Sequence, residues 1–465
     1  MTEALLRRLR ELDVRLSAAG EVLRYDAPRA ALTPELLAEL KAHKAALLAH
    51  LSGGPVSMQQ EAMAGAAATA PAPQVYNVAT RLTFTGRVDP AALATALTEL
   101  LARHVALRSR FSDATGEWRH HELPPAPVEL PVREVPDVTA ACEALAATPI
   151  DLSRSTTPLC GLFRVDDTHW VLMLVLHHIT VDGWALSLVL RELAELYRAA
   201  LAGTPAELAP PAAQCTDHAR WQRRAQDPAV VARKLANWCR RLAPITLTLT
   251  APTDHPRPPE RSGRGGTIRR PVPGSTRAAV EAFARSRGCT PFAVTASALA
   301  TTLTEDSLVF NVSYANRERR EFESMVDCTV MGLAVPVTVT DDFGETVDRT
   351  ALAALEGLDD LMPYSRILAH LREHRTDVPP KSPVAFTYQN FPPPPAAFAD
   401  LPVLVEDLAP PASRTDLAIG LTPCADPADG YRAFLEYSAD LWERESAEAM
   451  LDRFAAALAA VPGAG

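Results

Sequence analysis

Features that assign many proteins to a class at a glance are missing from this sequence. The 465 residues carry a formal net charge of −10, and this acidic balance gives no support to nucleic-acid binding, which would call for a basic patch or stripe. The seven cysteines are scattered, without a Cys-x-x-Cys pair or a Cys/His cluster at zinc spacing. No apolar run approaches the roughly 18 residues of a membrane span, and the charged N-terminus lacks the core of a signal peptide. We expect a cytoplasmic protein with reduced thiols, no metal site and neither nucleic acid nor membrane as a partner.

What the chain does have is length and apolar content. With 48% hydrophobic residues over 465 positions it can bury substantial cores, and it exceeds one ordinary domain. The Ser-Gly-Gly-Pro segment at 52–55 is rich in breakers and marks a boundary, after which the sequence changes character. We expect a small module over residues 1–51, a linker over 52–56, and two or three domains in all.

The most informative stretch is an apolar run that ends in two histidines. Residues 171–176 are uniformly apolar, which is typical of a short strand buried on both faces. His177 and His178 follow, and because strand side chains alternate, one ring must enter the packed interior while the other faces the space on the opposite side. Asp182 and Gly183 close a turn before an amphipathic helix. The two histidines therefore cannot share one role.

In the first module, apolar residues recur first at helical spacing, then alternate as in strands, and then return to helical spacing. Leucines at helical spacing over residues 5–12 predict a short helix, and alternating segments at 14–16 and 21–27 predict a hairpin. Thr33-Pro34 is a helix start signal, and leucines at helical spacing follow it as far as residue 51. The predicted order is helix, hairpin, helices.

The His-His-x-x-x-Asp-Gly pattern of residues 177–183 resembles the signature of condensation domains from nonribosomal peptide synthetases. More loosely, it resembles the His-x-x-x-Asp acyltransferases related to chloramphenicol acetyltransferase. Residues 1–51 resemble the TubC-type N-terminal docking domain of these synthetases. Other segments that resemble the condensation-domain pattern are Ser57-x-x-Gln60-Glu61, 103–111, 149–159, 214–222, 382–390, 414–422 and 434–442.

The resemblance lapses at several positions. Ala62-Met63-Ala64 stand where the family has Arg-Leu-Trp, and Cys215 and His218 replace aromatic residues. Segment 325–337 also departs from the family pattern, and because this element lies near the acceptor side in relatives, substrate preference cannot be transferred. The replacements in that segment are Asp327 for Gly, Met331 for Asn and Gly332 for Thr.

The resemblance implies an α/β fold. Two chloramphenicol-acetyltransferase-like lobes, over residues 57–228 and 229–465, would form a V-shaped pseudo-dimer, and the docking domain would be a small α+β unit. The histidine turn would lie at the base of a tunnel through the lobe interface. The segment 252–266, rich in Pro and Gly, is expected to be a surface connector early in the second lobe, and the protein is expected to be a monomer.

The resemblance also implies roles for individual residues. His178 and Gly183 would be catalytic, with His178 acting as general base or holding the acceptor amine. Asp182 would fix the turn through an ion pair with Arg317, and His177 would support the site from the interior. The expected tunnel residues are Trp184, Ser313, Met331 and Gln389. The expected docking residues, which would pair with an acidic peptide added to the hairpin edge, are Arg24 and Arg29.

The implied function is amide (peptide) bond formation between a carrier-bound donor acyl or peptidyl thioester and an acceptor amine, in the biosynthesis of secondary metabolites such as antibiotics. The chain itself would bind no cofactor, and the phosphopantetheine arms of partner carrier proteins would be its substrates. The expected partners are the C-terminal tail of an upstream synthetase, captured by the docking domain, and the donor and acceptor carrier proteins.

Other functions compete with this one. Epimerisation domains share the motif but normally act beside a carrier domain, and this sequence shows no carrier segment. Cyclisation domains carry Asp in place of the paired histidines, and an acyltransferase that uses soluble coenzyme A would have no use for a docking module. A catalytically silent recruitment domain would not need the intact motif. With Trp184 after the motif glycine, the segment resembles condensation domains that take an L-configured donor or a starter acyl group more than those that take a D-residue donor.

Overall fold

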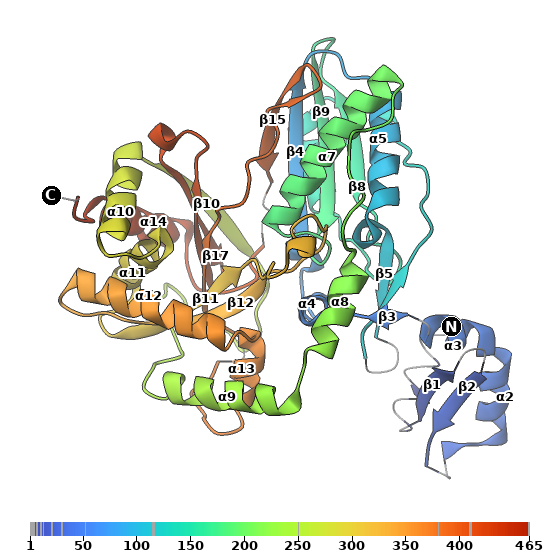
Figure 1. Cartoon of the computed structure of the whole chain (residues 1–465), viewed down its shortest axis with the longest axis horizontal. Coiled ribbons are helices and arrows are strands. Elements are labelled where there is room, and N and C mark those ends of the chain that lie inside the picture. The colour runs from blue at the N-terminus through green and yellow to red at the C-terminus, as the bar shows by residue number, and fades with distance from the viewer. Residues whose placement is uncertain are drawn as a thin grey trace.

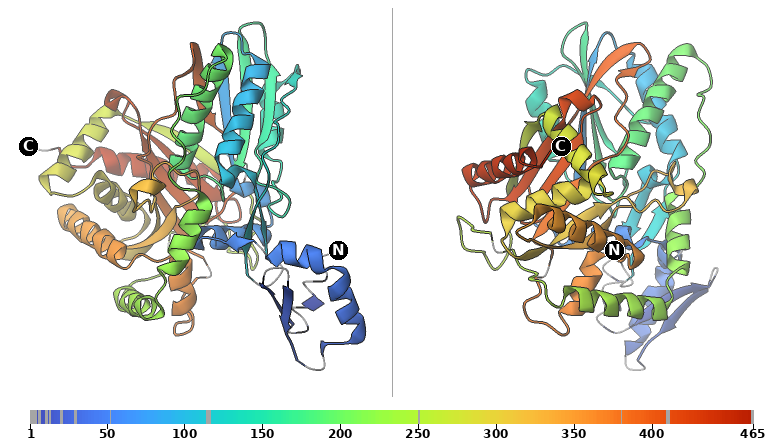
Figure 2. Two further views of the ribbon diagram at one scale, coloured as in Figure 1. Left: turned by 45° about the vertical axis from the view of Figure 1, so that its right-hand side comes forward. Right: turned by 60° about the vertical axis from the view of Figure 1, so that its left-hand side comes forward.

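The computed structural model has three parts, a small N-terminal module and two larger lobes (Figure 1). It describes positions 5, 8–9, 12, 14–19, 22–28, 31–51, 53–113, 117–249, 251–379, 381–408 and 412–463. The N-terminal module projects from the first lobe, as further views show (Figure 2). Each lobe is built on its own six-stranded sheet with helices packed on it, so the expected two-lobed α/β architecture is confirmed.

The N-terminal module is a hairpin with two helices packed on it. Its strands pair antiparallel as predicted, and the predicted helix start is confirmed because the Thr33 side chain accepts the amide of Leu36. The leucine stripe is divided between two helices by a break at His43. The helix predicted over 5–12 falls largely outside the described residues. The described elements are β1 (Arg15–Ala19), β2 (Val22–Asp26), α2 (Pro34–Ala42) and α3 (Lys44–Leu51).

The first lobe holds a sheet of strand order β14-β15-β4-β9-β8-β7 and a smaller sheet of order β3-β6-β5. Its helices are α4 (Met58–Ala68), α5 (Pro90–Arg103), α6 (Val138–Ala146), α7 (Gly183–Ala202) and α8 (Cys215–Arg224), with 3₁₀ turns at Pro73–Tyr76 and Val105–Arg108. Its own strands are β3 (Gly54–Pro55), β4 (Asn77–Thr85), β5 (Ser109–Ser112), β6 (Arg119–Glu122), β7 (Val132–Arg133), β8 (Leu159–Arg164) and β9 (His169–His177).

The second lobe holds a sheet of strand order β10-β17-β16-β13-β11-β12. Its strands are β10 (Gly265–Val272), β11 (Ser307–Tyr314), β12 (Met331–Thr338), β13 (Val384–Tyr388), β16 (Leu417–Pro423) and β17 (Tyr431–Ser438). Its helices are α9 (Pro228–Leu242), α10 (Gly274–Ser286), α11 (Pro291–Leu303), α12 (Phe343–Asp359), α13 (Tyr364–Leu371) and α14 (Arg444–Ala459), with 3₁₀ turns at Arg320–Phe322 and Pro427–Asp429. The segment 251–264 forms neither helix nor strand, in agreement with most of the connector predicted over 252–266, whereas Gly265 and Gly266 belong to β10.

One hairpin of the second lobe crosses to the first. Strands β14 (Ala397–Phe398) and β15 (Leu401–Asp407) extend the first sheet, with β15 antiparallel to β4. Phe398 is fully buried against Phe84 of β4 and Tyr197 of α7, so the hairpin contributes to the first core. The predicted division of the chain into two contiguous lobes after residue 228 therefore does not match the sheets, because the first sheet includes strands from residues 397–407. The pairing joins strands far apart in the sequence, and no local pattern encodes it.

Strand β9 is buried on both faces, as its sequence predicts. Leu172, Leu174 and Leu176 face the core formed with α5 and α7, whereas Val171, Met173 and Val175 face the smaller core formed with α6. The histidine turn therefore begins at the end of a rigid central strand, between two packed layers. None of the helices in the described ranges combines the length and the apolar composition needed to cross a membrane.

Candidate active site

The turn between β9 and α7 is fixed by the residue before the helix. Asp182 is the N-cap of α7, and its Oδ1 accepts the amide of Ala185 at 2.7 Å. Gly183 takes the first helical position, and a Cβ there would lie 2.4 Å from Cε1 of Phe391, a residue that follows β13 in the second lobe. Glycine is therefore required for the close approach of the second lobe to the turn.

The two histidines lie in different surroundings. His177 is 2% exposed, its Nδ1 accepts the amide of Ile179 at 3.0 Å, and its ring stacks on that of Tyr76. Burial lowers the pKa of His177 to about 3, so the ring is neutral at physiological pH. His177 lines a cavity of about 850 Å³ whose wall also includes Phe111 and Trp118. Its sequence-predicted supporting role stays a prediction.

His178 is half-buried and is held from both lobes. Its amide donates to the carbonyl of Tyr76 at 2.7 Å, and its Nδ1 lies 3.7 Å from the thiol sulfur of Cys328 in the second lobe. Burial lowers the pKa of His178, and the nearby Arg414 guanidinium acts in the same direction. The ring is therefore neutral at neutral pH, and a neutral imidazole can accept a proton.

Asp182 and Arg317 form a buried ion pair across the lobe boundary. Nη2 of Arg317 lies 3.1 and 3.3 Å from the two carboxylate oxygens, and the side chains are 5% and 1% exposed for Arg317 and Asp182. The amide and hydroxyl of Thr329 donate to Asp182 Oδ2 at 3.1 and 3.0 Å. Nη1 of Arg317 donates to the carbonyls of Phe322 and Met325. The pair thus ties the turn to the segment 317–329 that crosses from the second lobe.

The residues predicted to line a tunnel have different surroundings. Met331 lines a cavity of about 320 Å³ between α4, β12 and α13. Trp184 Nε1 donates to the carbonyl of Glu323 at 2.8 Å, which adds a hydrogen bond between the lobes beside the turn. The remaining two make polar contacts within the second lobe: the Ser313 and Thr387 hydroxyls lie 3.0 Å apart, and Gln389 Oε1 accepts from the Thr422 hydroxyl at 2.6 Å.

The cavity beside Met331 has a mixed wall. Its charged lining residues, Lys381 and Arg414, are both cationic, and its wall includes Tyr76, whose carbonyl accepts the amide of His178. Apolar side chains from both lobes complete it: Met58, Met63, Val330 and Leu368. A space of this kind can hold an acyl or aminoacyl group close to the histidine turn.

Four residues around the turn were given no role by the sequence analysis. They are Tyr76, Cys328, Thr329 and Arg414. Arg414 falls in segment 414–422, which resembles the family pattern and is a weak signal, whereas nothing local distinguishes Cys328 or Thr329. Their closeness to the turn comes from docking of the lobes.

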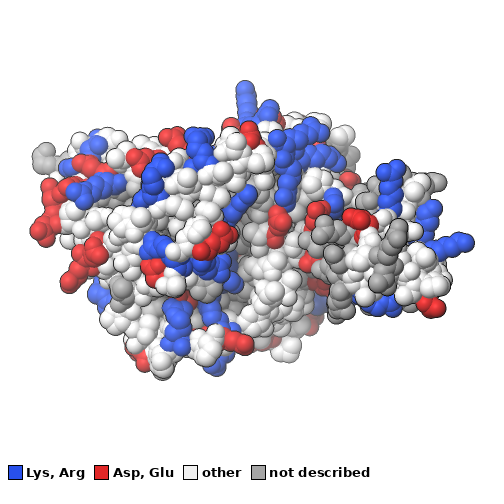
Figure 3. All heavy atoms as spheres, turned by 90° about the horizontal axis from the view of Figure 1, so that it is seen from below, with Lys and Arg blue, Asp and Glu red and all other residues white. Residues whose placement is uncertain are grey.

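The predicted docking residues lie on the N-terminal module. Arg24 is exposed on β2, opposite Ser17 of β1, and Val22 and Tyr25 on the same strand are also exposed. Arg29 lies outside the described residues. Seen from below, several Lys and Arg side chains project from this module at the right of the molecule (Figure 3). The docking roles stay predictions.

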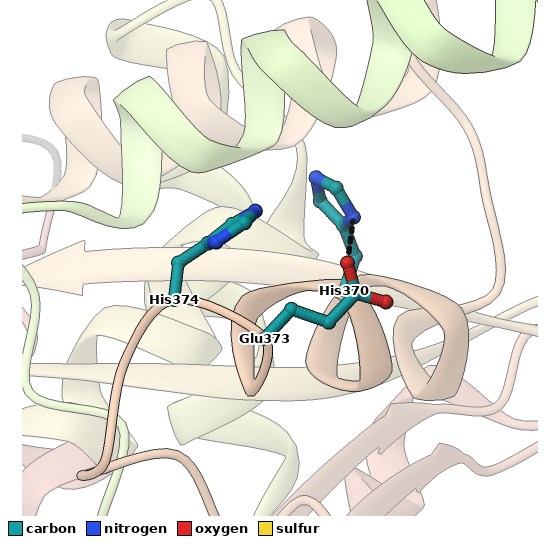
Figure 4. Close-up of side chains that lie close together, drawn as sticks. All are labelled: His370, Glu373 and His374. Atoms are coloured by element: carbon teal, nitrogen blue, oxygen red, sulfur yellow. Dashed lines mark ion pairs between the residues drawn. The ribbon is translucent and has the colours of Figure 1, made fainter.

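A cluster outside the histidine turn has ligand chemistry. His370, Glu373 and His374, at the end of α13, place their ligand atoms within 4.8 Å of one another (Figure 4). The sequence analysis predicted no metal site. These side chains are half-buried or exposed on one helical turn, and His370 and Glu373 are 3.5 Å apart. No second feature of the described structure points to a bound ion there, so we assign the cluster no function.

The comparisons with known proteins agree with this geometry. Residues 54–463 match the family model of the condensation domain, and residues 3–52 match that of the TubC N-terminal docking domain. The chain therefore belongs to the condensation-domain family, with a docking domain of the TubC type before it. Both predictions from the sequence are confirmed.

The relatives are synthetases much longer than this chain. A probable non-canonical nonribosomal peptide synthetase, CymA of Salinispora arenicola, is 32% identical over 405 residues, which are 83% of this chain and 5% of that protein. The phosphinothricin tripeptide synthetase PhsC of Streptomyces viridochromogenes is 30% identical over 419 residues, which are 84% of this chain and 38% of that protein. The chain thus spans only a small part of the first of these relatives and less than half of the second.

Solved structures share the fold. The X-domain from teicoplanin biosynthesis is 26% identical with a TM-score of 0.77, covering 88% of this chain and 94% of that one. SgcC5 of Streptomyces globisporus is 25% identical with a TM-score of 0.72, covering 87% and 98%. The first condensation domain of the calcium-dependent antibiotic synthetase, 20% identical with a TM-score of 0.75 over 89% and 97%, is similar in fold.

Proposed function

We propose that this chain is an acyltransferase that forms an amide bond between a donor acyl or peptidyl thioester and an acceptor amine, both delivered by carrier proteins. The observation that carries the proposal is the neutral, half-buried ring of His178 at a turn locked by the Asp182–Arg317 pair. The phosphopantetheine arms of the carriers are the substrates, and the chain needs no cofactor of its own for this reaction.

The reaction balances without an oxidant or a metal. The acceptor amine attacks the thioester carbonyl, a C–N bond forms, and collapse of the tetrahedral intermediate breaks the C–S bond. The proton lost by the amine ends on the departing thiol of the donor arm. His178 accepts that proton or holds the amine through its free nitrogen, and Gly183 keeps the turn small enough for the second lobe to close over it.

Typical rate effects indicate that positioning of the reactants contributes more to catalysis than general-base help does. An α-amine with a pKa of about 7.7–8.0 is partly neutral near pH 7.5, so its deprotonation costs under about 1 kcal/mol. General-base help is typically worth about 10²–10⁴-fold in rate. Holding two tethered reactants in line is worth about 7–11 kcal/mol, which is more than the base supplies.

The proposed domain boundaries are those predicted from the sequence, except that one hairpin of the second lobe belongs to the sheet of the first. Residues 1–51 form the docking domain, 52–56 the linker, 57–228 the first lobe and 229–465 the second, except that the hairpin 397–407 completes the first sheet. The exposed edge of the β1–β2 hairpin is suited to an added peptide strand, which we assign to the tail of an upstream synthetase. The donor and acceptor carriers are the other partners, and the chain is a monomer in the cytoplasm.

A second candidate function is recruitment without catalysis. It is favoured by the similarity to the X-domain from teicoplanin biosynthesis, which has also been solved in complex with OxyB. A recruitment domain binds its partner through a surface and gives the histidine turn no chemical task.

A single-turnover assay separates the two functions. Purified chain is mixed with an aminoacyl-loaded donor carrier and a loaded acceptor carrier, and the product on the acceptor arm is followed by mass spectrometry. Catalysis predicts dipeptide on the acceptor with the wild-type chain and loss of it with His178→Ala. Equal product with the two chains, or none with several cognate carrier pairs that bind, would instead support recruitment.

A further inference from the structure

Three consecutive residues of the crossing segment each touch a different part of the first lobe. The Asp327 carboxylate accepts from His218 Nδ1 at 3.2 Å and from Gln60 Nε2 at 3.0 Å. Cys328 places its sulfur 3.7 Å from His178 Nδ1. Thr329 donates twice to Asp182. One short stretch of chain is thus anchored by Asp327 and positions both the histidine and the aspartate of the motif.

The anchor is deeply buried. The side chains of His218 and Asp327 are both 0% exposed, and they lie on α8 of the first lobe and on the segment before β12 of the second. The His218 ring is stacked on Trp221 and meets the edge of Phe322, so its plane is fixed from two sides. Asp327 Oδ1 also accepts the amide of Cys328 at 2.9 Å, which fixes the backbone at the start of the stretch.

Hydrogen bonding explains why the two residues occur together. Asp182 and Asp327 bring two carboxylates into the lobe boundary, where Arg317 pairs with Asp182 and His218 Nδ1 lies 3.2 Å from the Asp327 carboxylate. Burial raises the pKa of Asp327, and His218 acts against that rise. An uncompensated carboxylate at this depth would be strongly destabilising. Asp327 and His218 are also two of the positions where the sequence departs from the family pattern, so the departures compensate each other in space.

We propose that His218 and Asp327 are positioning residues, whose buried pair sets the depth of segment 327–329 and thereby the placement of His178 and Asp182. This role rests on the proposed amide-forming function and adds two positioning residues to the site. Neither residue of the pair is proposed to contact substrate. Loss of the pair should let the stretch shift, and a misplacement of about 1 Å at a catalytic group can cost about 100-fold in rate.

A double-mutant cycle tests the pair. The variants Asp327→Asn, His218→Gln and the double variant are assayed in single turnover and across donor concentrations. We expect each single variant to lower kcat by about 10- to 100-fold with KM changed less than about twofold, and the double variant to be no slower than the slower single one. Additive losses, or an unchanged kcat, would overturn the proposal.

The chain offers a matched control in the same lobe. His104 Nε2 lies 2.8 Å from Glu192 Oε2, with side chains 1% and 14% exposed, and this pair joins the end of α5 to α7. His104→Gln should lower the melting temperature and leave kcat unchanged. If His104→Gln lowers kcat as much as His218→Gln does, the effect is general destabilisation and the positioning role is wrong.

A readout without turnover keeps the two proposals distinguishable. Peptide-resolved mass spectrometry after iodoacetamide treatment measures alkylation of Cys328, with the buried Cys142 of the first lobe as an internal reference. Asp327→Asn and His218→Gln should speed alkylation of Cys328 and leave Cys142 unchanged. Equal Cys328 rates in all chains would refute the positioning role even if no amide forms. If Asp327→Asn does not fold, His218→Gln carries both measurements.

Discussion

The two lobes contain the same strand, turn and helix, and only one copy carries the residues of the proposed active site. In the first lobe β9 lies between β4 and β8 and leads through residues 178–182 into α7. In the second, β17 lies between β10 and β16 and leads through residues 439–443, a stretch of the same length, into α14. Position by position, Ala439 stands where His178 does, and Glu443 where Asp182 does.

The helix caps show what separates the copies. Asp182 caps α7 with its side chain, is 1% exposed and pairs with Arg317 of the other lobe. Glu443 makes no side-chain cap, and its 65% exposed carboxylate pairs with His255 at the surface. The backbone framework therefore supplies a turn in both lobes. The proposed active site lies at the copy in which side chains and a crossing segment from the partner lobe enclose that turn.

The largest expected effect comes from removing the side-chain cap of α7, so that this helix start, like that of α14, has no side-chain cap. Asp182→Ala strands the buried Arg317 guanidinium and should cost about 3–5 kcal/mol of unfolding free energy, with loss of activity. Denaturant unfolding followed by fluorescence measures it. The matched change Glu443→Ala should stay within about 0.5 kcal/mol, because an exposed pair contributes little. Similar losses in the two variants would remove the distinction between the caps.

The second effect concerns the reactive ring. His178→Ala gives the first turn the residue of the second and should lower the single-turnover rate by about 10²–10⁴-fold with little change in melting temperature. His177→Ala instead should lower stability, because its ring is buried, stacks on Tyr76 and accepts the Ile179 amide. An active His178→Ala chain would show that the ring has no part in proton transfer.

The third effect is a pH dependence that only the first copy should have. The pKa of folded His177 is about 3, below an unfolded value near 6.5, so the unfolded chain binds more protons between these values. Stability should therefore fall as pH drops below about 6.5, by up to about 1.4 kcal/mol per pH unit from this residue. His177→Ser, the residue found at Ser438 in the second lobe, should flatten the slope. Unfolding at pH 7.5, 6 and 5 measures it, and an unchanged slope would contradict burial of a neutral ring.

The smallest effect lies outside both lobes. The docking domain has its own core of Leu5, Leu9, Val14, Leu36, Leu40 and Leu47, so deleting residues 1–53 should leave both lobes folded. Transfer from the natural upstream partner should slow by about tenfold at low donor concentration and recover at high concentration. Arg24→Glu should weaken tail binding by a few-fold, since an exposed pair is worth about 0.2–1 kcal/mol. Equal transfer by the truncated and complete chains at low donor concentration would end the docking assignment.

The sequence alone determined the features that depend on neighbours along the chain. The uniform apolar run of 171–176 specified a strand buried on both faces, Asp182 and Gly183 specified the turn and the helix start, and Thr33-Pro34 specified the start of α2. Period, capping and turn chemistry act over a few residues, so they can be read without the fold. The family pattern then placed Arg317 opposite Asp182, and the pair is present in the structure.

Only the tertiary structure decided what surrounds the turn. The hairpin 397–407 in the first sheet, Phe391 against Gly183, the Cys328 thiol beside His178 and the buried pair of His218 with Asp327 all join residues more than 100 positions apart. These contacts arise when two separately cored lobes dock, and their energies depend on burial and charge balance at the shared boundary. No local propensity encodes that boundary, which is why the sequence located the histidine turn and the fold alone located the residues that support it.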